Sequence, residues 1–383
     1  MRFLHLADLH LGKRVNGFDL LDDQRFILEQ VVDLCAGRSV DAVVVAGDIY
    51  DVPQPPAGAV LLLDWFLTEL AARGVKVLAV SGNHDSAERL DYAVRLLARQ
   101  GVYLAGRFTG SLAPVTLADD AGPVEFVLLP FVRAATVRHF LPDAAIRTYD
   151  EAVAAALATL PPAGGARRVL VAHQFVTAGA CPPQTAGSES CAVEVGTVEQ
   201  VDAARFAGFC YAALGHIHRP QAVGCGTVRY AGSPLSYSLD ECGAEKSAPL
   251  VTLAADGSAG IELVPLAPRR AMRHLTGPLA RLTDPANVCG SEDYIWATLT
   301  DETPVPDAMA RLRAAYPNAM KLDYAPRSVA PDDGAARTAA QVRRRSFAEL
   351  FGDFFATVQG RTPTQAELDA LNALREEVDP CGR

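Results

Sequence analysis

The sequence lacks the cysteine pairs of zinc ribbons and redox motifs. Its eight cysteines, at positions 35, 181, 191, 210, 225, 242, 289 and 381, include no C-x-x-C pair. Cysteines of this kind are typical of small buried side chains or free thiols in a reducing compartment. Cys181 and Cys191 are near enough in sequence to form a bridge, but the same setting disfavours one. We therefore expect neither a structural zinc site nor a disulfide framework.

Long apolar runs and an N-terminal leader are also missing. No stretch approaches the ~18 uninterrupted apolar residues of a membrane helix. Arg2 and Asp8 introduce charge too early for a signal peptide. No phosphate-binding P-loop motif is present either, so any use of ATP would have to come from a partner. We expect a cytoplasmic protein with no membrane partner.

Positive charge is in deficit. Lys and Arg number 35 against 45 Asp and Glu, which gives a formal net charge of −10. This balance argues against a general nucleic-acid-binding surface. It does not exclude an enzyme that acts on nucleic acid, because local clusters and bound cations decide the field at a site. The basic clusters, such as 343–345, are better interpreted as solvated faces, so DNA affinity of this chain alone should be modest and salt-dependent.

What the sequence does contain is an alternation of strands and helices in a chain long enough for two or three domains of roughly 150 residues. Strands are predicted at 2–7, 41–46, 75–80, 168–171, 211–214, 228–231, 250–253 and 261–264, and helices at 22–35, 58–72 and 87–99. The nearly continuous valine run at 41–46 is typical of a strand buried on both faces. The fold class predicted for residues 1–266 is α/β, a two-sheet sandwich with functional loops at one sheet edge.

Three further segments follow this sandwich. A small α/β domain is predicted at 267–325, with strands at 294–299 and 320–324 and a helix at 306–315. Residues 326–345 have the composition of a linker. Residues 346–383 then form a helical hairpin that begins with a capping-box pattern and carries phenylalanines on one face. We interpret this hairpin as a partner-binding element, with packing against the main body as the alternative.

Five short motifs each follow a predicted strand: Asp8-Leu9-His10, Gly47-Asp48, Gly82-Asn83-His84-Asp85, Ala172-His173-Gln174 and Gly215-His216-Ile217-His218. A lone histidine at a strand end is usually structural, and we assign His5 to hydrogen bonding within the fold. Yet five of the eight histidines lie in these motifs. Carboxylate, imidazole and amide ligands that converge at one sheet edge suit a pair of divalent cations. Asp48 is the natural bridging ligand, because no other motif supplies a second carboxylate at that point.

The motifs at 8–12, 47–51, 82–85 and 215–218 resemble those of the calcineurin-like metallophosphoesterase superfamily. Two further stretches, 211–221 and 230–238, resemble the SbcD nuclease family within it, the bacterial counterparts of the Mre-type repair nucleases. The resemblance is specific from residue 1 to about 245 and weaker beyond. The order of the later segments nevertheless matches that family's capping domain and partner-binding tail.

The resemblance implies a ligand set for two ions. One ion would be held by Asp8, His10, Asp48 and His218, and the other by Asp48, Asn83, His173 and His216. Imidazole and carboxylate ligands suit Mn²⁺, the family's usual metal, with Mg²⁺ as the alternative. Two such cations activate water and clamp the attacking and leaving oxygens of an in-line displacement at phosphorus.

Other positions carry expectations of a different kind. His84 should not be a ligand but should face the scissile phosphate as a proton donor. Asp85 would either orient His84 from behind or shape the turn. Asp51 stands where some family members carry a second catalytic histidine, and we interpret it as a marker of the bacterial branch. The loop 177–195 is similar to the family's Ser/Glu motif, which suggests a DNA-path or dimer role; a flexible loop would have the same composition.

The function that the resemblance implies is a metal-dependent DNA nuclease, a double-strand exonuclease and single-strand endonuclease acting on DNA ends and hairpins. It would work as a homodimer within a heterotetramer that includes an SbcC-type coiled-coil ATPase. The helices at 58–72 and 87–99 would form the dimer contact, although helices buried on the sheet give the same pattern. Two alternatives are a small-molecule metallophosphoesterase that hydrolyses cyclic nucleotides, and a metal-binding scaffold that tethers the ATPase.

Overall fold

The computed structural model describes residues 1–179, 181–187 and 200–325, together with a few residues between 352 and 368. The predicted linker, nearly all of the predicted helical hairpin, and Ser188-Glu189-Ser190 in the loop 177–195 lie outside the described residues. The chain divides into two compact units, Met1–Ala325 and Pro326–Arg383. In the described part of the chain, no helix is both long and apolar enough to cross a bilayer.

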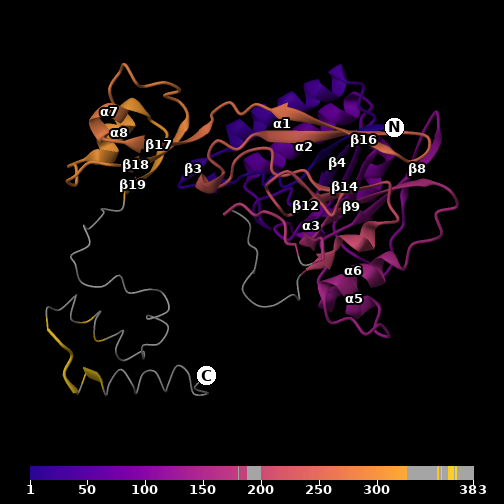
Figure 1. Ribbon diagram of the computed structural model, residues 1–383. Helices are drawn as coiled ribbons and strands as arrows, with labels where there is room; N and C mark the ends of the chain where they lie inside the picture. Colours follow the sequence, from indigo (N-terminus) through magenta and orange to yellow (C-terminus); the bar gives the residue numbers. More distant parts are fainter. Residues whose placement is uncertain are drawn as a thin grey trace. The chain divides into compact units, whose positions relative to one another are not determined.

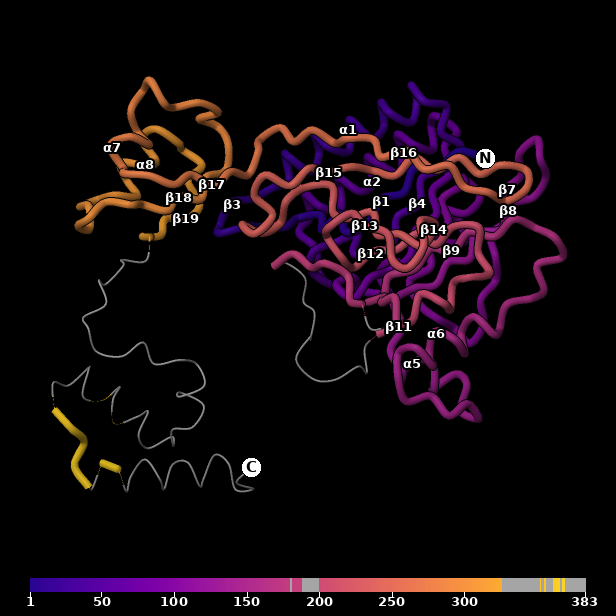
Figure 2. The backbone as a smooth tube through the Cα atoms, viewed as in Figure 1, coloured from indigo at the N-terminus to yellow at the C-terminus, as the bar shows by residue number. Residues whose placement is uncertain are grey.

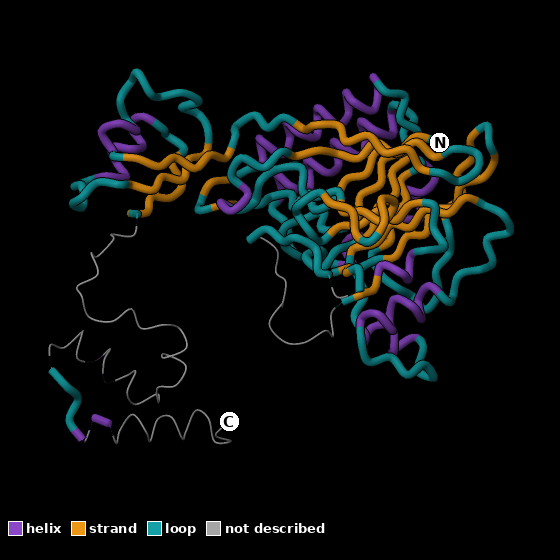
Figure 3. Tube along the Cα trace, in the orientation of Figure 1, coloured by secondary structure: helices purple, strands orange, loops and turns teal. Residues whose placement is uncertain are grey.

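The first unit contains two six-stranded sheets packed face to face, as Figures 1 and 3 show. The first sheet has the order β16-β15-β1-β4-β5-β6. Its strands are β1 (Arg2–Leu6), β4 (Ala42–Ala46), β5 (Lys76–Val80), β6 (Val102–Ala105), β15 (Lys246–Leu253) and β16 (Ala259–Leu266). The four strands β1, β4, β5 and β6 run parallel, and β15 and β16 add an antiparallel edge.

The second sheet has the order β13-β14-β12-β9-β8-β7. Its strands are β7 (Val115–Asp119), β8 (Gly122–Leu129), β9 (Arg167–His173), β12 (Tyr211–Gly215), β13 (Gln221–Val223) and β14 (Cys225–Tyr230). The central strands β8, β9, β12 and β14 are parallel, whereas β7 and β13 are antiparallel edges. A central parallel strand must be apolar on both faces, which explains the continuous buried run in β12.

Helices cover the outer face of each sheet. The helices α1 (Leu21–Gly37) and α2 (Ala57–Ala72) pack on the first sheet, and α5 (Ala134–Phe140) and α6 (Tyr149–Leu157) pack on the second. Between the sheets lies a separate core in which Phe3 makes edge-to-face ring contacts with Phe126 and Tyr211, at centroid distances of 5.6 and 5.7 Å. The two-sheet sandwich expected from the sequence is therefore present.

The helix predicted at 87–99 is the main correction. The structure has two short helices there, α3 (Ala87–Leu90) and α4 (Val94–Leu97), followed by a 3₁₀ turn. The chain breaks at Ala93, whose φ of 59° lies in the left-handed region and cannot continue a helix. The apolar residues at helical spacing in 87–99 therefore belong to two short helices and not to one continuous helix. The sandwich also contains two short strand pairs, β2 (Arg14–Val15) with β3 (Phe18–Asp19) and β10 (Val176–Thr177) with β11 (Val201–Asp202). Two 3₁₀ turns, η3 (Ala203–Phe206) and η4 (Leu239–Glu241), lie in its loops.

The small domain is a three-stranded parallel sheet. Its strands are β17 (Met272–Gly277), β18 (Tyr294–Leu299) and β19 (Ala319–Tyr324), and its helices are α7 (Leu279–Leu282) and α8 (Ala308–Ala315). The helices close an apolar core of their own on one face of the sheet. The buried carboxylate of Asp23 in α1 accepts hydrogen bonds from Arg270 (2.7 Å) and Tyr294 (2.8 Å), which joins this domain to the sandwich.

Candidate metal centre

The five sequence motifs meet at one edge of the sandwich. Each lies at the carboxyl end of a parallel strand, β1, β4, β5, β9 or β12, and β1, β4, β9 and β12 lie close together in Figure 2. The loops are tied to one another: the backbone N–H of Asp8 donates to Gly47 O (3.1 Å), and that of His10 donates to Asp48 O (2.9 Å). The N–H of His216 donates to Asp8 Oδ1 (2.9 Å), which links the two sheets. Ligand sites in open α/β sheets form at such carboxyl ends.

The backbone is strained at this edge. Among the described residues, eight that are not glycine have a positive φ, and four of them are predicted ligands: Asp8 (53°), His10 (43°), Asp48 (47°) and His216 (100°). A left-handed conformation costs a residue with a Cβ about 1–2 kcal/mol. Such strain persists where the surrounding structure fixes the residue, and it is concentrated at functional sites.

The glycines of the motifs allow the side chains to pack closely. A Cβ on Gly47, whose φ is +81°, would lie 2.3 Å from Nδ1 of His173. A Cβ on Gly82 would lie 2.0 Å from Oδ1 of Asp48. Both distances are well below van der Waals contact. The motif glycines are therefore part of the site, because any side chain there would displace a predicted ligand.

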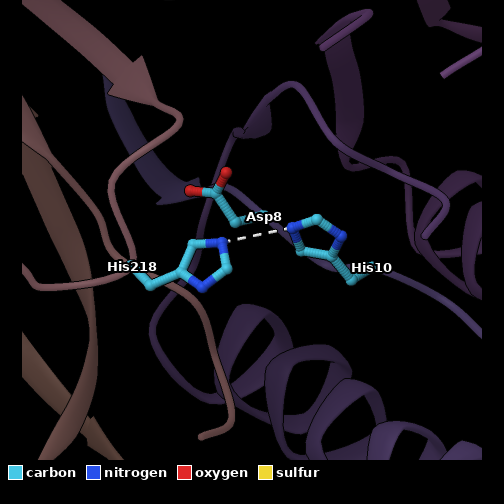
Figure 4. Close-up of side chains that lie close together, drawn as sticks. All are labelled: Asp8, His10 and His218. Carbon is cyan, nitrogen blue, oxygen red and sulfur yellow. Dashed lines mark hydrogen bonds between the residues drawn. The ribbon is translucent and has the colours of Figure 1, made fainter. Parts of the chain in front are cut away.

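The first group of converging side chains consists of Asp8, His10 and His218, all of which are buried (Figure 4). The Nε2 atoms of His10 and His218 are 3.2 Å apart. Asp8 Oδ2 has no hydrogen-bond partner among the described residues. A buried carboxylate oxygen without a partner is costly, and two imidazole nitrogens that face one another need a shared proton or a cation.

The second group consists of Asn83, His173 and His216, with Asp48 beside them. Asn83 Oδ1 is 3.0 Å from His173 Nε2 and also 3.0 Å from His216 Nδ1. The Nδ1–H of His173 donates to the carbonyl oxygen of Ala46 (2.8 Å). That hydrogen bond leaves Nε2 of His173 directed at Asn83 and at Asp48 Oδ2, which is 3.3 Å away.

Asp48 lies between the two groups. Its Oδ2 is 3.3 Å from His173 Nε2 on one side and 3.6 Å from His10 Nε2 on the other. Its Oδ1 accepts the backbone N–H of His84 (2.9 Å), which fixes the carboxylate plane. One carboxylate oxygen thus faces both groups of imidazoles.

The charges of two ligands favour ligation, whereas burial at His173 is outweighed by the Asp48 carboxylate, which raises the pKa of that imidazole to about 9. Burial alone would raise the pKa of Asp48, but the nearby imidazoles of His173 and His10 lower it far below its usual range. Burial lowers the pKa of His216 to about 3, with repulsion from His173 acting in the same direction. Asp48 is therefore ionised and His216 neutral at neutral pH, the states in which each side chain binds a metal ion.

The donor set fits two divalent cations. Carboxylate, imidazole and amide oxygen are ligands of Mn²⁺, Mg²⁺ and similar ions, and the unpartnered oxygen of Asp8 and the facing imidazole nitrogens are satisfied by a cation. The side chains that would hold one ion are Asp8, His10, Asp48 and His218. Those that would hold the other are Asp48, Asn83, His173 and His216.

His84 lies beside these groups. Its Nδ1–H donates to the carbonyl oxygen of Asp51 (2.9 Å), and its ring centroid is 4.9 Å from that of His10. Asp85 accepts three backbone N–H groups, from Ile49 (3.1 Å), Tyr50 (2.9 Å) and Gly82 (2.9 Å). These bonds connect the loop after β4 with the loop after β5. Asp85 therefore has the turn-shaping role that was one of its two predicted roles. That Asp85 also orients His84 stays a prediction.

Other residues of the site were not identified from the sequence. The carboxylate of Asp51 lies 3.2 Å from His10 Nδ1, and that of Glu241 lies 3.9 Å from His218 Nδ1. The sequence indicates Asp51 only as a marker of the bacterial branch, although it lies three residues after Asp48. Glu241 carries no local signal, since its contact with His218 depends on how η4 packs. His5, by contrast, lies in the core and hydrogen-bonds Tyr211 (Nδ1 to hydroxyl, 3.0 Å), as expected.

Comparison with known proteins gives two family matches. Residues 1–220 match the calcineurin-like phosphoesterase family, and residues 268–359 match SbcD_C, described as the type 5 capsule protein repressor C-terminal domain. The second match includes the small domain and extends beyond residue 325.

Solved structures give weaker likenesses. A dimetal phosphatase from Danio rerio is 12% identical, with 71% of this chain and 98% of that chain covered and a TM-score of 0.38. GAP50, the anchor in the inner membrane complex of Plasmodium, is 13% identical, with 86% and 98% covered and a TM-score of 0.37. YfcE, a phosphoesterase from E. coli, is 17% identical, with 70% and 100% covered and a TM-score of 0.27. These TM-scores are too low to bear on function.

The first family match alone covers residues 1–220 of 383, more than half of the chain, and it contains every predicted ligand. The chain therefore belongs to the calcineurin-like phosphoesterase family and is a metal-dependent phosphoesterase.

Proposed function

We propose that this phosphoesterase is a DNA nuclease of the SbcD type, which hydrolyses phosphodiester bonds with two divalent cations, Mn²⁺ in the first place. The observation that carries the two-ion centre is the position of Asp48 Oδ2, within 3.6 Å of imidazole nitrogens from both groups. The match of residues 268–359 to SbcD_C supports the nuclease branch of the family. A phosphatase for small molecules has no evident use for such an added domain.

The cations, when bound, supply Lewis acidity to the phosphoryl oxygens and make water a nucleophile near neutral pH. His84 supplies the proton for the leaving oxygen. Because its Nδ1–H donates to the carbonyl oxygen of Asp51, Nε2 is the ring nitrogen that would transfer the proton. Asp48 holds the backbone of His84 through Oδ1, so that one side chain sets both the ion positions and the proton donor. A positioned donor of this kind contributes about 10²–10⁴-fold to a rate.

The proposal extends to the assembly. The net charge of −10 implies weak DNA binding by this chain alone. We therefore expect DNA ends and hairpins to be held jointly with an SbcC-type coiled-coil ATPase, in a heterotetramer built on a homodimer of this chain. Duplex exonuclease action would need ATP from that partner, whereas single-strand cleavage would not. A reducing cytoplasm is the expected location, in keeping with the free cysteines among the described residues.

The test is a substrate comparison with purified full-length protein and Mn²⁺. End-labelled single-stranded and hairpin DNA should be cut, a cyclic nucleotide should be hydrolysed far more slowly, and Asp48→Asn should abolish both activities. Hydrolysis of the cyclic nucleotide without DNA cleavage would identify a small-molecule phosphodiesterase instead. Protein that binds two ions but cuts neither substrate, with or without the ATPase, would support the scaffold alternative.

A further inference from the structure

Behind His10 lies a carboxylate that is itself paired with a lysine. Asp51 Oδ1 is 3.2 Å from His10 Nδ1 and accepts a hydrogen bond from Lys13 Nζ at 2.8 Å. The opposite ring nitrogen of His10, Nε2, faces His218. Lys13 thus holds the Asp51 carboxylate beside the ring of His10.

The same arrangement lies behind His218. Glu241 Oε1 is 3.9 Å from His218 Nδ1, and Glu241 Oε2 forms an ion pair with Lys246 Nζ. The two imidazoles proposed for the first ion thus each have a lysine-paired carboxylate behind Nδ1.

Lys246 also holds the backbone of His218. Its ammonium group donates to the carbonyl oxygen of His218 (3.2 Å) and to Ser233 Oγ (2.9 Å). The pair is deeply buried, with Glu241 1% and Lys246 6% exposed. Burying two charges is costly before they attract one another, so a buried ion pair is seldom more stable than apolar side chains in its place. Its contacts at both the ring and the carbonyl of His218 point to a role in placing that residue.

The second group is built differently. Nδ1 of His173 donates to the neutral carbonyl oxygen of Ala46 at 2.8 Å, and the carboxylate near that atom, Asp8 Oδ1 at 3.9 Å, is not paired with a lysine among the described residues. A carboxylate behind a metal-bound imidazole fixes its tautomer and raises its basicity more strongly than a neutral acceptor does. The two proposed ion sites therefore differ in how their imidazoles are supported.

We propose that the pairs Lys13–Asp51 and Lys246–Glu241 are positioning residues, which hold His10 and His218 in the tautomer that directs Nε2 at the first ion and so strengthen binding of that ion. Asp51, at 3.2 Å, would take the Nδ1–H of His10, whereas Glu241, at 3.9 Å, would favour a proton on His218 Nδ1 through its charge; each lysine keeps its carboxylate in place. The inference rests on the proposed two-ion site, but not on DNA as the substrate.

The test uses the full chain with the near-isosteric variants Glu241→Gln and Asp51→Asn. Calorimetric titration with Mn²⁺ should show binding of one of the two ions weakened by about 10–100-fold in either variant, as is usual when a residue that supports a metal ligand is replaced. The other ion should bind as in the wild type. Asp23→Asn is the matched control: it alters a buried carboxylate that is bound by Arg270 and Tyr294, and should leave the affinity for both ions unchanged.

A second readout needs neither metal nor activity. In the metal-free protein, ¹⁵N NMR of the imidazoles should show Nδ1 of both His10 and His218 protonated, with any further proton shared between the two facing Nε2 atoms. In Glu241→Gln, His218 should gain the tautomer protonated at Nε2, while Asp51→Asn should produce that change at His10. A merely structural role for the pairs would lower stability without moving these signals.

Wild-type affinity for both ions in Glu241→Gln and Asp51→Asn, with unchanged tautomers, would overturn the inference and leave the proposed function standing. Wild-type protein that binds fewer than two ions would overturn the proposed function and the inference with it. If Glu241→Gln does not fold, Asp51→Asn decides, because its side chain is 19% exposed and tolerates the change more easily.

Discussion

Single glycines set the geometry of the site because their backbone lies very close to the predicted ligands. Gly82 is the clearest case, because a Cβ there would lie 2.0 Å from Asp48 Oδ1. We predict that Gly82→Ala displaces Asp48, weakens the binding of both ions and destabilises the fold by about 2 kcal/mol or more. Gly208→Ala is the control, since a Cβ there meets nothing within 4 Å. Mn²⁺ titration measures the ion affinity, and chemical denaturation measures the stability. Equal affinity and stability of the two variants would show that the short distance between residue 82 and Asp48 does not constrain the site.

His84 is predicted to act on the substrate and not on the ions. We expect His84→Ala to lower the rate of DNA cleavage by about 10²–10⁴-fold, the usual contribution of a positioned proton donor. Mn²⁺ affinity should stay at the wild-type value, because the imidazole Nδ1–H is bound by Asp51 O and the residue belongs to neither ligand group. Single-turnover cleavage and metal titration measure the two quantities. Loss of an ion in this variant would make His84 a ligand instead.

At this scale, the sequence predicted the residues that follow a strand directly and missed those placed by long-range packing. Asp8, Asp48 and His173 could be singled out because each ends a short apolar run and belongs to a recognisable motif. Glu241 could not, because its contact with His218 arises only when η4 and β15 pack beside the loop after β12. A polar residue in a polar loop gives no sign of such burial.

At the scale of elements, the break between α3 and α4 has a measurable cost. Ala93 adopts φ 59°, which costs a residue with a Cβ about 1–2 kcal/mol. Glycine removes that cost but loses about 0.5–1 kcal/mol more entropy on folding. We predict that Ala93→Gly is neutral or stabilises the protein by up to about 1 kcal/mol, whereas Ala93→Val destabilises it. Urea denaturation measures the stability of the wild type, Ala93→Gly and Ala93→Val. The prediction would be wrong if Ala93→Gly were clearly the least stable of these three proteins.

The valine-rich strands β4 and β5 were predictable, whereas β8, also a central parallel strand, was not among the predicted strands. The strands β4 and β5 lie within a residue of their predicted bounds, because both faces are covered and the apolar run is continuous. The edge strand β7 was missed, because its residues alternate between exposed and half-buried, and polar and small residues dominate it. β17, with Arg273, His274 and Thr276 on partly exposed positions, was missed for the same reason. Pairing with a neighbouring strand, not local sequence, makes these segments strands.

At the scale of the whole molecule, the buried His5 makes stability depend on pH. Burial lowers the pKa of His5 to about 3, while an unfolded histidine titrates near 6.5. Between these values the unfolded chain binds the extra proton, so stability is present above about pH 6.5 and is lost as the pH falls toward 3. His5→Asn keeps an acceptor near the Tyr211 hydroxyl but cannot titrate.

We therefore predict that the melting temperature of the wild type falls more steeply between pH 7 and pH 4 than that of His5→Asn. Other titrating groups are common to both proteins, so only the difference in slope is attributed to His5. Differential scanning calorimetry in chelator-treated samples measures it. Parallel slopes would show that His5 takes up no proton on unfolding in this range.

The central claim is that one carboxylate oxygen, Asp48 Oδ2, serves two cations at the edge of the sandwich. The most direct measurement is the number of Mn²⁺ ions bound per chain, from titration of metal-free protein followed by electron paramagnetic resonance. The account predicts two bound ions with a spin-coupled spectrum, and loss of the coupling in Asp48→Asn. A single bound ion, or two uncoupled ions that Asp48→Asn leaves unchanged, would contradict it.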